Sequence, residues 1–430
     1  MILSNAAVVS VVVMVGLSLA RLNILLAIIA ASLVAGVMGN LSVVKTIQIM
    51  IGGMQGNLET ALSYVLLGAL AVMISTGNLI KVVLYKLVGV MDQRATILCF
   101  LIALISCFSQ NLIPVHIAFI PILIPPLLHL MNRLQLDRRA VACALTFGLQ
   151  APYMTIPAGF GLIFQNLLVE HLNKNGIPTT LSQVVGVMSI SGFAMLVGLV
   201  VAVLVLYKKP RVYQDSLVVH TDEPPRLEWR DYLTLAGIIL AFAVQLATGS
   251  LPLGAFIGLM VMLAGGVIKW RDMDNVIDEG VKMMAFVAFV MLVAAGFGEV
   301  LQKTHAIADL VSATSAMVTT KLEGALLMLS IGLFITIGIG TSFGTIPIIA
   351  AFYCPLCVAL GFSTSATILL VGIAAALGDA GSPASDSTIG PTTGLNADKQ
   401  HSHIYDTCVP TFLVYNIPLI VFGTIGALLL

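Results

Sequence analysis

The fold is decided by the stretch Gly372-Ile-Ala-Ala-Ala-Leu-Gly-Asp-Ala-Gly-Ser-Pro-Ala-Ser-Asp-Ser-Thr-Ile-Gly-Pro-Thr-Thr-Gly-Leu-Asn396. It starts as an apolar helix, changes at Gly378 into glycine, proline and hydroxyl residues with two carboxylates, Asp379 and Asp386, and then resumes. Inside a membrane, unwound backbone is tolerated only where protein buries it or where it lines a polar cavity. Ionisable side chains at that depth are candidates for function. We therefore interpret this stretch as a binding site.

The composition predicts an all-α polytopic membrane protein. The 430 residues are 59% hydrophobic and 9% charged, with a mean hydropathy of +1.06, whereas soluble domains carry about 25% charged residues. Twenty basic and twenty acidic residues cancel, so no basic field points to nucleic acid. The first apolar run continues after Arg21 into another, which indicates a transmembrane helix and not a signal peptide. No glycine-rich phosphate loop with its lysine is found, which argues against an ATP-driven pump.

The order of apolar segments predicts the elements of a first half, residues 1–206. Complete spans are expected at 4–20, 22–38, 57–75 and 184–206, an interfacial segment at 40–56 and an amphipathic connector at 79–90. Two short arms within 95–131 flank Ser109-Gln-Asn-Leu-Ile-Pro114 and predict a re-entrant hairpin with a polar tip. A further helix, 138–172, is expected to be broken between Gly148 and Gly159.

A second half, residues 232–430, repeats this order after a charged linker at 207–231. The offset is about 230 residues: 22–36 matches 251–265, the tip at 109 matches 340–345, and the break at 148–152 matches 378–383. Five crossings per half are an odd number, so the second half is expected to be inverted. The predicted fold is therefore two inverted-topology repeats, each with about five transmembrane helices, one of them broken, plus a re-entrant hairpin.

The basic residues support this topology. With the linker placed in the cytoplasm and the N-terminus outside, most of the twenty Lys and Arg residues fall inside, as the positive-inside rule requires. Those expected outside are Lys45, Lys174, Lys303 and Lys321.

Both hairpin tips and both breaks are expected to meet near the membrane midplane, where hydroxyl, amide and carbonyl oxygens suit Na+. The first half supplies Ser109, Gln110, Asn111, Gly148, Gln150, Pro152 and Thr155. The second supplies Thr341, Ser342, Thr345, Asp379, Ser382, Ser385, Asp386 and Thr388. Because only the second half carries acids, we expect the driving ion there. The candidate Na+ ligands are Asp379, Ser382, Thr341, Ser342, Ser109 and Asn111.

Structural explanations stay open for these residues. Gly, Ser and Thr also occur where transmembrane helices pack closely, and either aspartate could cap a helix. His116 is a candidate proton carrier or substrate contact, or a hydrogen-bonded packing residue. His401 and His403 stand in an expected cytoplasmic loop without partner cysteines, which does not favour a metal site. The spacing of Cys354 and Cys357 is explained by packing.

Two motifs resemble a known family. Gly378-Asp-Ala-Gly-Ser-Pro-Ala-Ser-Asp-Ser-Thr-Ile-Gly-Pro-Thr392 and His403-Ile-Tyr-Asp-Thr-Cys-Val-Pro410 are similar to the bacterial sodium/proton antiporter C-type family, within the ion transporter superfamily, and to its branch of amino-acid, histidine-like permeases. The resemblance implies an inverted-repeat fold, often dimeric, in which a transport part moves against a scaffold. The tips depart from the Ser-Asn-Thr of the dicarboxylate symporters, so a dicarboxylate substrate is not expected.

The sequence thus predicts a secondary active transporter and not an enzyme. It would couple a Na+ or H+ gradient to movement of a small solute, most simply an amino acid, across the bacterial cytoplasmic membrane by alternating access. The alternative is a Na+/H+ antiporter without an organic substrate. No cofactor besides the coupling ion is expected, and the expected partners are the solute, Na+ or H+, membrane lipid and a second copy of the chain.

Overall fold

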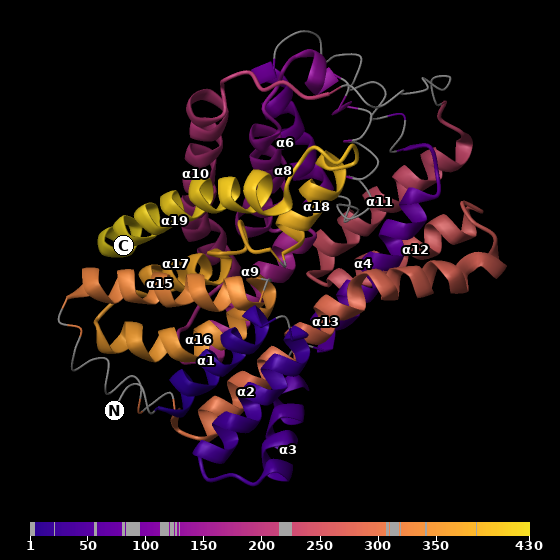
Figure 1. Ribbon diagram of the computed structural model, residues 1–430. Coiled ribbons are helices and arrows are strands. Elements are labelled where there is room, and N and C mark those ends of the chain that lie inside the picture. Colours follow the sequence, from indigo (N-terminus) through magenta and orange to yellow (C-terminus); the bar gives the residue numbers. More distant parts are fainter. Residues whose placement is uncertain are drawn as a thin grey trace.

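A computed structural model describes residues 5–20, 22–55, 58–79, 82, 95–111, 120, 124, 127–128, 130–214, 226–306, 309, 318, 320–339, 342–383 and 385–430. Helices make up all the regular secondary structure of these residues (Figure 1). The expected connector at 79–90 and the second arm of the first hairpin fall almost entirely outside them.

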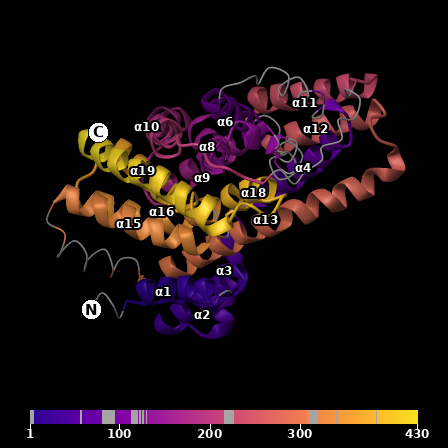
Figure 2. The same cartoon turned by 45° about the horizontal axis from the view of Figure 1, so that its top comes forward.

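The described helices form two groups by their contacts. The first group contains α1 (Ala6–Leu19), α2 (Ile24–Met38), α3 (Val43–Met54), α4 (Leu58–Ser75), α11 (Trp229–Thr248), α12 (Leu251–Ala264) and α13 (Met273–Lys303). The long helix α13 packs on α2, α3 and α4, and Figures 1 and 2 both show it running from beside α12 to beside α2. A 3-10 turn, η4 (Trp270–Asp272), precedes α13.

The second group contains the hairpin arms and the broken helices. Its members are α6 (Ala95–Asn111), α8 (Arg138–Thr155), α9 (Phe160–Lys174), α10 (Leu181–Val201), α15 (Lys321–Ile339), α16 (Ser342–Ala359), α17 (Thr364–Ala376), α18 (Asp386–Leu395) and α19 (Val409–Leu429), with the π-helical turns η3 (Ala202–Leu206) and η5 (His403–Cys408). The groups meet mainly where α13 packs on α16 and α1 on α15. Each group therefore combines helices from both halves of the sequence.

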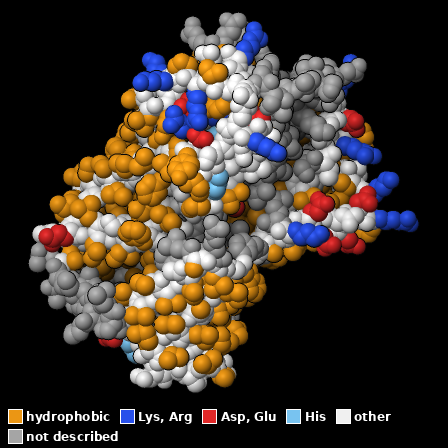
Figure 3. Space-filling model, in the orientation of Figure 1, with side chains coloured by type: hydrophobic (Ala, Val, Ile, Leu, Met, Phe, Trp, Pro, Cys, Tyr) orange, Lys and Arg blue, Asp and Glu red, His pale blue; other side chains and the backbone are white. Residues whose placement is uncertain are grey.

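The surface and the helix lengths fit a membrane protein. Apolar side chains cover α15, α19 and the α1–α3 region, while basic side chains gather along the top and right edge of the view (Figure 3). Among the described residues, three helices are long and apolar enough to cross a membrane: 181–206, 342–359 and 403–429. An all-α polytopic architecture, as expected from composition, is confirmed.

Helix starts recur at a constant interval. Helices α6, α8 and α9 begin at Ala95, Arg138 and Phe160, and α15, α17 and α18 begin 226 residues later, at Lys321, Thr364 and Asp386. The interval is slightly shorter than the offset of about 230 expected from the sequence.

The first helix break begins later than expected. Gly148 and Pro152 lie inside α8, which continues to Thr155, and α9 starts at Phe160. Gly148 serves close packing, because a Cβ there would lie 2.2 Å from the Cβ of Ser106 on α6. The helix stops before Pro157 and not at Pro152, since a residue that precedes proline is driven into extended backbone, as Ile156 is.

The second break lies where the sequence placed it. Helix α17 ends at Ala376 and α18 begins at Asp386. Gly378 and Gly381 have φ angles of +84° and +100°, which glycine adopts without strain. A Cβ on Gly381 would also lie 2.4 Å from Phe412 of α19. Unwound chain at this position therefore depends on glycine for both its conformation and its packing.

Candidate functional site

Asp379 lies at the centre of the second break, bound by hydroxyl groups from three elements. Its Oδ2 accepts hydrogen bonds from the Tyr153 hydroxyl of α8, at 2.7 Å, and from the Ser342 hydroxyl at the start of α16, at 2.8 Å. The Ser385 hydroxyl, at the start of α18, donates to Oδ1. Asp379 is 6% exposed. Among the described residues, no Lys, Arg or His forms an ion pair with it.

The remaining oxygens of the break are held by nearby hydroxyls. Ser387 donates to the backbone carbonyl of Asp379 at 3.0 Å, and its hydroxyl lies 2.9 Å from that of Ser385. Thr388 donates to the carbonyls of Ser382 and Ser385. This network of oxygen atoms surrounds a carboxylate and offers the ligands that a hard cation such as Na+ uses.

Polar side chains from neighbouring helices satisfy the free backbone groups. Gly378 N–H donates to Asn416 Oδ1 at 2.8 Å, and Asn416 Nδ2 donates to the Ala380 carbonyl at 2.8 Å. Gln150 Nε2 donates to the carbonyl of Ala376, the last residue of α17, at 2.8 Å. A break in an apolar interior needs such partners, because unpaired backbone groups are costly away from water. The unwound segment is therefore held in a defined shape.

An aromatic cluster borders the carboxylate. The ring of Phe343, next to Ser342, contacts the rings of Tyr64, Tyr153, Phe160 and Phe164 at centroid distances of 5.9, 5.2, 6.2 and 5.8 Å. Tyr64 comes from α4 of the first helix group, whereas the other rings belong to the second group. The cluster therefore spans the boundary between the groups beside Asp379.

The structure brings together part of the predicted site. Asp379, Ser342 and Ser385 are in direct contact, Gln150 reaches the end of α17, and Thr388 shapes the break. Ser382 donates to the carbonyl of Ile337 at 3.1 Å, and Thr345 is buried in α16 one turn after Ser342. Asp386 is exposed at the start of α18.

Other predicted residues lie away from Asp379 or outside the described part of the chain. Thr155 donates to Ala151 of its own helix, and its methyl group packs beside Gly192 of α10. Gly148 and Pro152 are helical, as described above. The side chains of Ser109, Gln110 and Asn111 in the last turn of α6, and the residues His116 and Thr341, fall outside the described part of the chain.

Sequence reasoning missed Tyr153, Ser387 and Asn416. Tyr153 stands 226 residues before Asp379, the interval that separates the helix starts. Superposing the two halves at this interval would have paired the two residues. An offset of about 230 does not pair them, and Tyr153 was therefore not among the predicted site residues.

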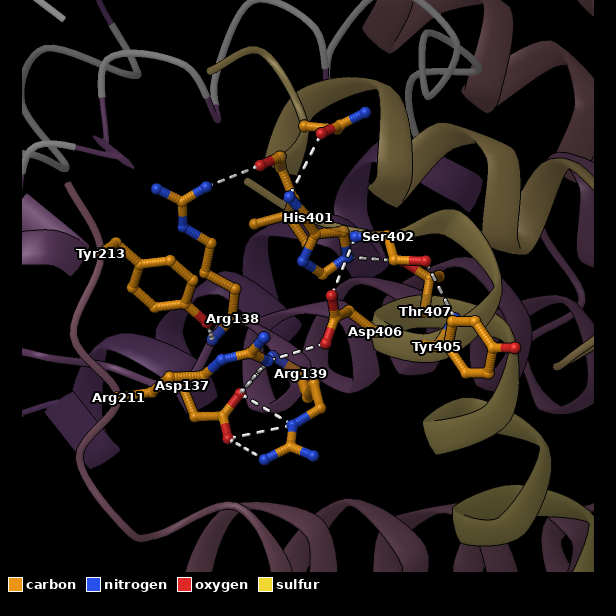
Figure 4. A network of polar contacts seen from close by, with 12 residues as sticks. Asp137, Arg138, Arg139, Arg211, Tyr213, His401, Ser402, Tyr405, Asp406 and Thr407 are labelled. Carbon is orange, nitrogen blue, oxygen red and sulfur yellow. Dashed lines mark hydrogen bonds and ion pairs between the residues drawn. The ribbon is translucent and has the colours of Figure 1, made fainter. Parts of the chain in front are cut away.

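A second polar network joins the linker to the ends of α8 and α18 (Figure 4). Arg138 binds Asp398 through Nη1–Oδ1 and Nη2–Oδ2 contacts of 2.7 and 2.5 Å, with both side chains at most 1% exposed. Its guanidinium also lies 4.2 Å from the centroid of the Tyr213 ring. Burial alone would raise the pKa of Asp398, but the hydrogen bonds and charge of Arg138 lower it below its usual value.

The same network contains Arg211 and His401. Arg211 pairs with Asp406 at 2.7 Å, and His401 Nε2 lies 2.7 Å from the Thr407 hydroxyl. Burial lowers the pKa of His401 to about 4. In the described part of the chain, no group of three or more His, Cys, Asp or Glu residues is arranged to hold a metal ion.

These features are those of a polytopic membrane transporter whose break holds a buried carboxylate. Residues 144–424 match the model of the Na+/H+ antiporter family, and residues 5–91 match a model also described as a Na+-H+ antiporter family. The chain belongs to the Na+/H+ antiporter family. The family expected from the two motifs is thereby confirmed.

Relatives and solved structures agree with this assignment. The chain is 48% identical to an uncharacterised membrane protein of Vibrio parahaemolyticus, covering 99% of this chain and all of that protein. It is 44% identical, over 99% of this chain and all of the relative, to the putative amino acid transporter YuiF of Bacillus subtilis.

The fold is similar to that of two transporters. The crystal structure of YdaH from Alcanivorax borkumensis aligns with a TM-score of 0.58, and a structure of MtrF from Neisseria gonorrhoeae aligns with a TM-score of 0.57, each at 16% identity. The first alignment covers 87% of this chain and 86% of YdaH, and the second covers 90% of this chain and 85% of MtrF. MtrF is described within a class of antimetabolite efflux pumps.

Proposed function

We propose that this transporter couples a Na+ or H+ gradient to movement of an amino acid across the bacterial cytoplasmic membrane. The observation that carries the proposal is Asp379, a buried carboxylate at a helix break that is bound only by hydroxyls among the described residues. A charge in such a place is costly unless a cation or proton joins it. The amino-acid substrate is supported by the name of one relative, YuiF.

Gradient-driven uptake into proteoliposomes tests the proposal. We expect uptake of one or more of the twenty amino acids under an imposed Na+ or H+ gradient, and none without it. The family description favours the alternative, a Na+/H+ antiporter without organic substrate. That alternative is correct if no amino acid enters while added Na+ still dissipates a pH gradient. An uncoupled leak of amino acids would contradict both proposals.

We also propose that residues 1–206 and 232–430 are inverted repeats joined by a cytoplasmic linker. The constant interval of 226 residues between equivalent helix starts supports the repeat. Two sets of contacts support the proposed sides of the membrane. On the cytoplasmic side, the linker residue Arg211 contacts the start of α8 and the η5 turn. On the outer side, Lys174 and Lys303 both lie near the Glu299 carboxylate. Cysteine labelling of Lys174→Cys from the outside checks this topology.

Alternating access would require the second helix group to move against the first. The ends of α9 and α13 connect the groups through an ion pair of Lys174 with Glu299 at 2.8 Å and a hydrogen bond from Gln302 to Asn175 at 3.0 Å. A disulfide between Asn175→Cys and Gln302→Cys should therefore stop transport reversibly, whereas each single variant stays active after oxidation. Full transport by the cross-linked protein would rule out this movement.

A further inference from the structure

Two side chains hold the unwound segment between α17 and α18 near its opposite ends. Near its start, Asn416 of α19 donates to the Ala380 carbonyl at 2.8 Å. Near its end, Nε2 of His403 lies 3.0 Å from the Pro383 carbonyl. Asn416 is buried, whereas His403 is half-buried in the η5 turn and Pro383 is exposed. The segment that carries Asp379 is therefore tied to the protein surface through His403.

The imidazole ring of His403 is fixed at both of its nitrogen atoms. A carbonyl oxygen can only accept a hydrogen bond, so the contact with Pro383 requires a hydrogen on Nε2. Nδ1 lies 2.8 Å from the Thr392 hydroxyl, and in the neutral ring it accepts the hydrogen of that hydroxyl. Pro383 precedes α18, and Thr392 lies within it. The ring therefore bridges the point at which the unwound chain enters the helix.

The η5 turn holds His403 in this place. The turn is π-helical, and single π-helical turns occur frequently at functional sites. Ser402 caps the turn, and its N–H donates to the Asp406 carboxylate at 2.8 Å. The Thr407 hydroxyl of the same turn lies 2.9 Å from the Thr392 hydroxyl. Two side chains of η5 thus meet α18 at one residue, which fixes the position of the His403 ring.

The Pro383 carbonyl is close in the chain to a hydroxyl that binds Asp379. Ser385, two residues after Pro383, donates its hydroxyl hydrogen to Asp379 Oδ1. The proline ring fixes the φ angle of Pro383, so the orientation of its carbonyl constrains the direction in which the chain continues to Ser385. A donor that fixes this carbonyl therefore helps to fix the hydroxyl beside the carboxylate.

We infer that His403 is a positioning residue for the ion site at Asp379. By donating to the Pro383 carbonyl, its Nε2–H keeps the Ser385 hydroxyl where that oxygen serves both the carboxylate and a bound Na+. His403 acts through the backbone, because among the described residues no hydrogen bond joins it to Asp379. The inference rests on the proposed function and adds to it a residue of the η5 turn.

His403→Leu tests the inference, with His401→Leu as the matched control. Both changes remove one imidazole from the same short segment, but Nε2 of His401 is bonded to Thr407 and not to the unwound chain. Binding of radioactive Na+ to the purified protein is measured. In His403→Leu, half-saturation should require about three- to tenfold more Na+, the effect of one hydrogen bond. In His401→Leu we expect wild-type Na+ affinity.

His403→Gln provides the conservative rescue. Its amide nitrogen can donate to the Pro383 carbonyl in place of the imidazole, so Na+ affinity should stay close to that of the wild type. A role limited to stability would instead lower the Tm of His403→Leu and leave its Na+ affinity unchanged. If His403→Gln binds Na+ as weakly as His403→Leu, the hydrogen bond is not the cause and the inference is overturned.

NMR of the wild-type protein with nitrogen-labelled histidine observes the contact directly and does not depend on the folding of His403→Leu. The neutral ring of His403 should carry its hydrogen on Nε2. NaCl, but not choline chloride, should shift the Nε2 resonance, which is assigned by its loss in His403→Gln. Asp379→Asn should abolish this shift. A hydrogen on Nδ1 alone, or a resonance that NaCl does not move, would overturn the inference.

The Na+ affinities also separate the inference from the proposed function. Wild-type Na+ affinity in folded His403→Leu, combined with loss of binding in Asp379→Asn, would overturn the positioning role and leave the proposed function intact. Wild-type Na+ affinity in Asp379→Asn would instead overturn the proposed ion site itself.

Discussion

Asp379 and Asp398 are both buried carboxylates, but the protein stabilises them differently. Asp398 receives a bidentate guanidinium from Arg138, whose Nη atoms lie 2.7 and 2.5 Å from its two oxygens. Asp379 receives only neutral hydroxyls from the described residues. A guanidinium occupies the place that a mobile cation would take, so Asp398 is structural. Asp379 has no such fixed cation among the described residues, so an ion can bind to it reversibly.

Replacing Asp379 should have the largest effect on transport. Asp379→Asn keeps the size of the side chain but removes the charge that binds the ion, so transport should lose its dependence on Na+ or H+ gradients. The matched control is Asp398→Asn. The fraction of this variant that folds should still transport in a gradient-dependent way. Proteoliposome assays compare the two. Equal loss of coupling in both variants would erase the distinction between the carboxylates.

Breaking the Arg138–Asp398 pair should have the largest effect on stability. Arg138→Met leaves Asp398 buried without its partner, and such a loss costs about 3–5 kcal/mol. Thermal unfolding in detergent should show a clear drop in Tm. In Arg138→Met/Asp398→Leu no charge is left unpaired, so much of the loss should be recovered. A single variant as stable as the wild type would show that the pair contributes little.

Acid should weaken the same region through His401. Its pKa is about 4 in the folded protein, against about 6.5 when unfolded. The unfolded state therefore gains a proton first, and stability falls as the pH drops from about 6.5 to about 4, by up to about 3 kcal/mol. Asp398, whose pKa is lowered, loses its contribution only at still lower pH.

The variant His401→Gln isolates this effect. It cannot take up a proton, so its Tm should change less between pH 7 and pH 5 than that of the wild type. An identical pH dependence in both proteins would assign the acid sensitivity to other groups.

The smallest effect is expected from Arg211→Gln. The Arg211 side chain is 38% exposed where it meets Asp406, and solvent-exposed ion pairs contribute about 0–1 kcal/mol. Its Tm should therefore fall much less than that of Arg138→Met. A loss as large as that of Arg138→Met would mean that the linker contact contributes more than its exposure suggests.

The sequence predicted most of the framework because its signals are local. Apolar runs of membrane length give helices such as 22–38, observed as α2 (Ile24–Met38). The cluster of Gly, Pro and Asp after Gly372 indicates a break, because glycine and proline act on backbone conformation at their own positions. Asp379 could be singled out for the same reason, as an acid in an otherwise apolar segment.

The remaining features depend on packing between distant segments. Gly148 was interpreted as a break, but it permits contact with Ser106 of α6, and no local pattern distinguishes these two uses of glycine. Tyr153 has the appearance of a core aromatic until the break at Asp379 is folded against it. The pairing of Arg138 with Asp398, 260 residues apart, likewise has no signal in a single sequence.

Proton release on addition of Na+ tests the central claim most directly. Purified protein in weakly buffered detergent solution receives NaCl, with choline chloride as the control, and a pH indicator records the change. If H+ and Na+ compete for Asp379, the wild type should release protons as it binds Na+, and Asp379→Asn should release none. Proton release of wild-type size from Asp379→Asn would contradict the assignment of Asp379 as the ion site.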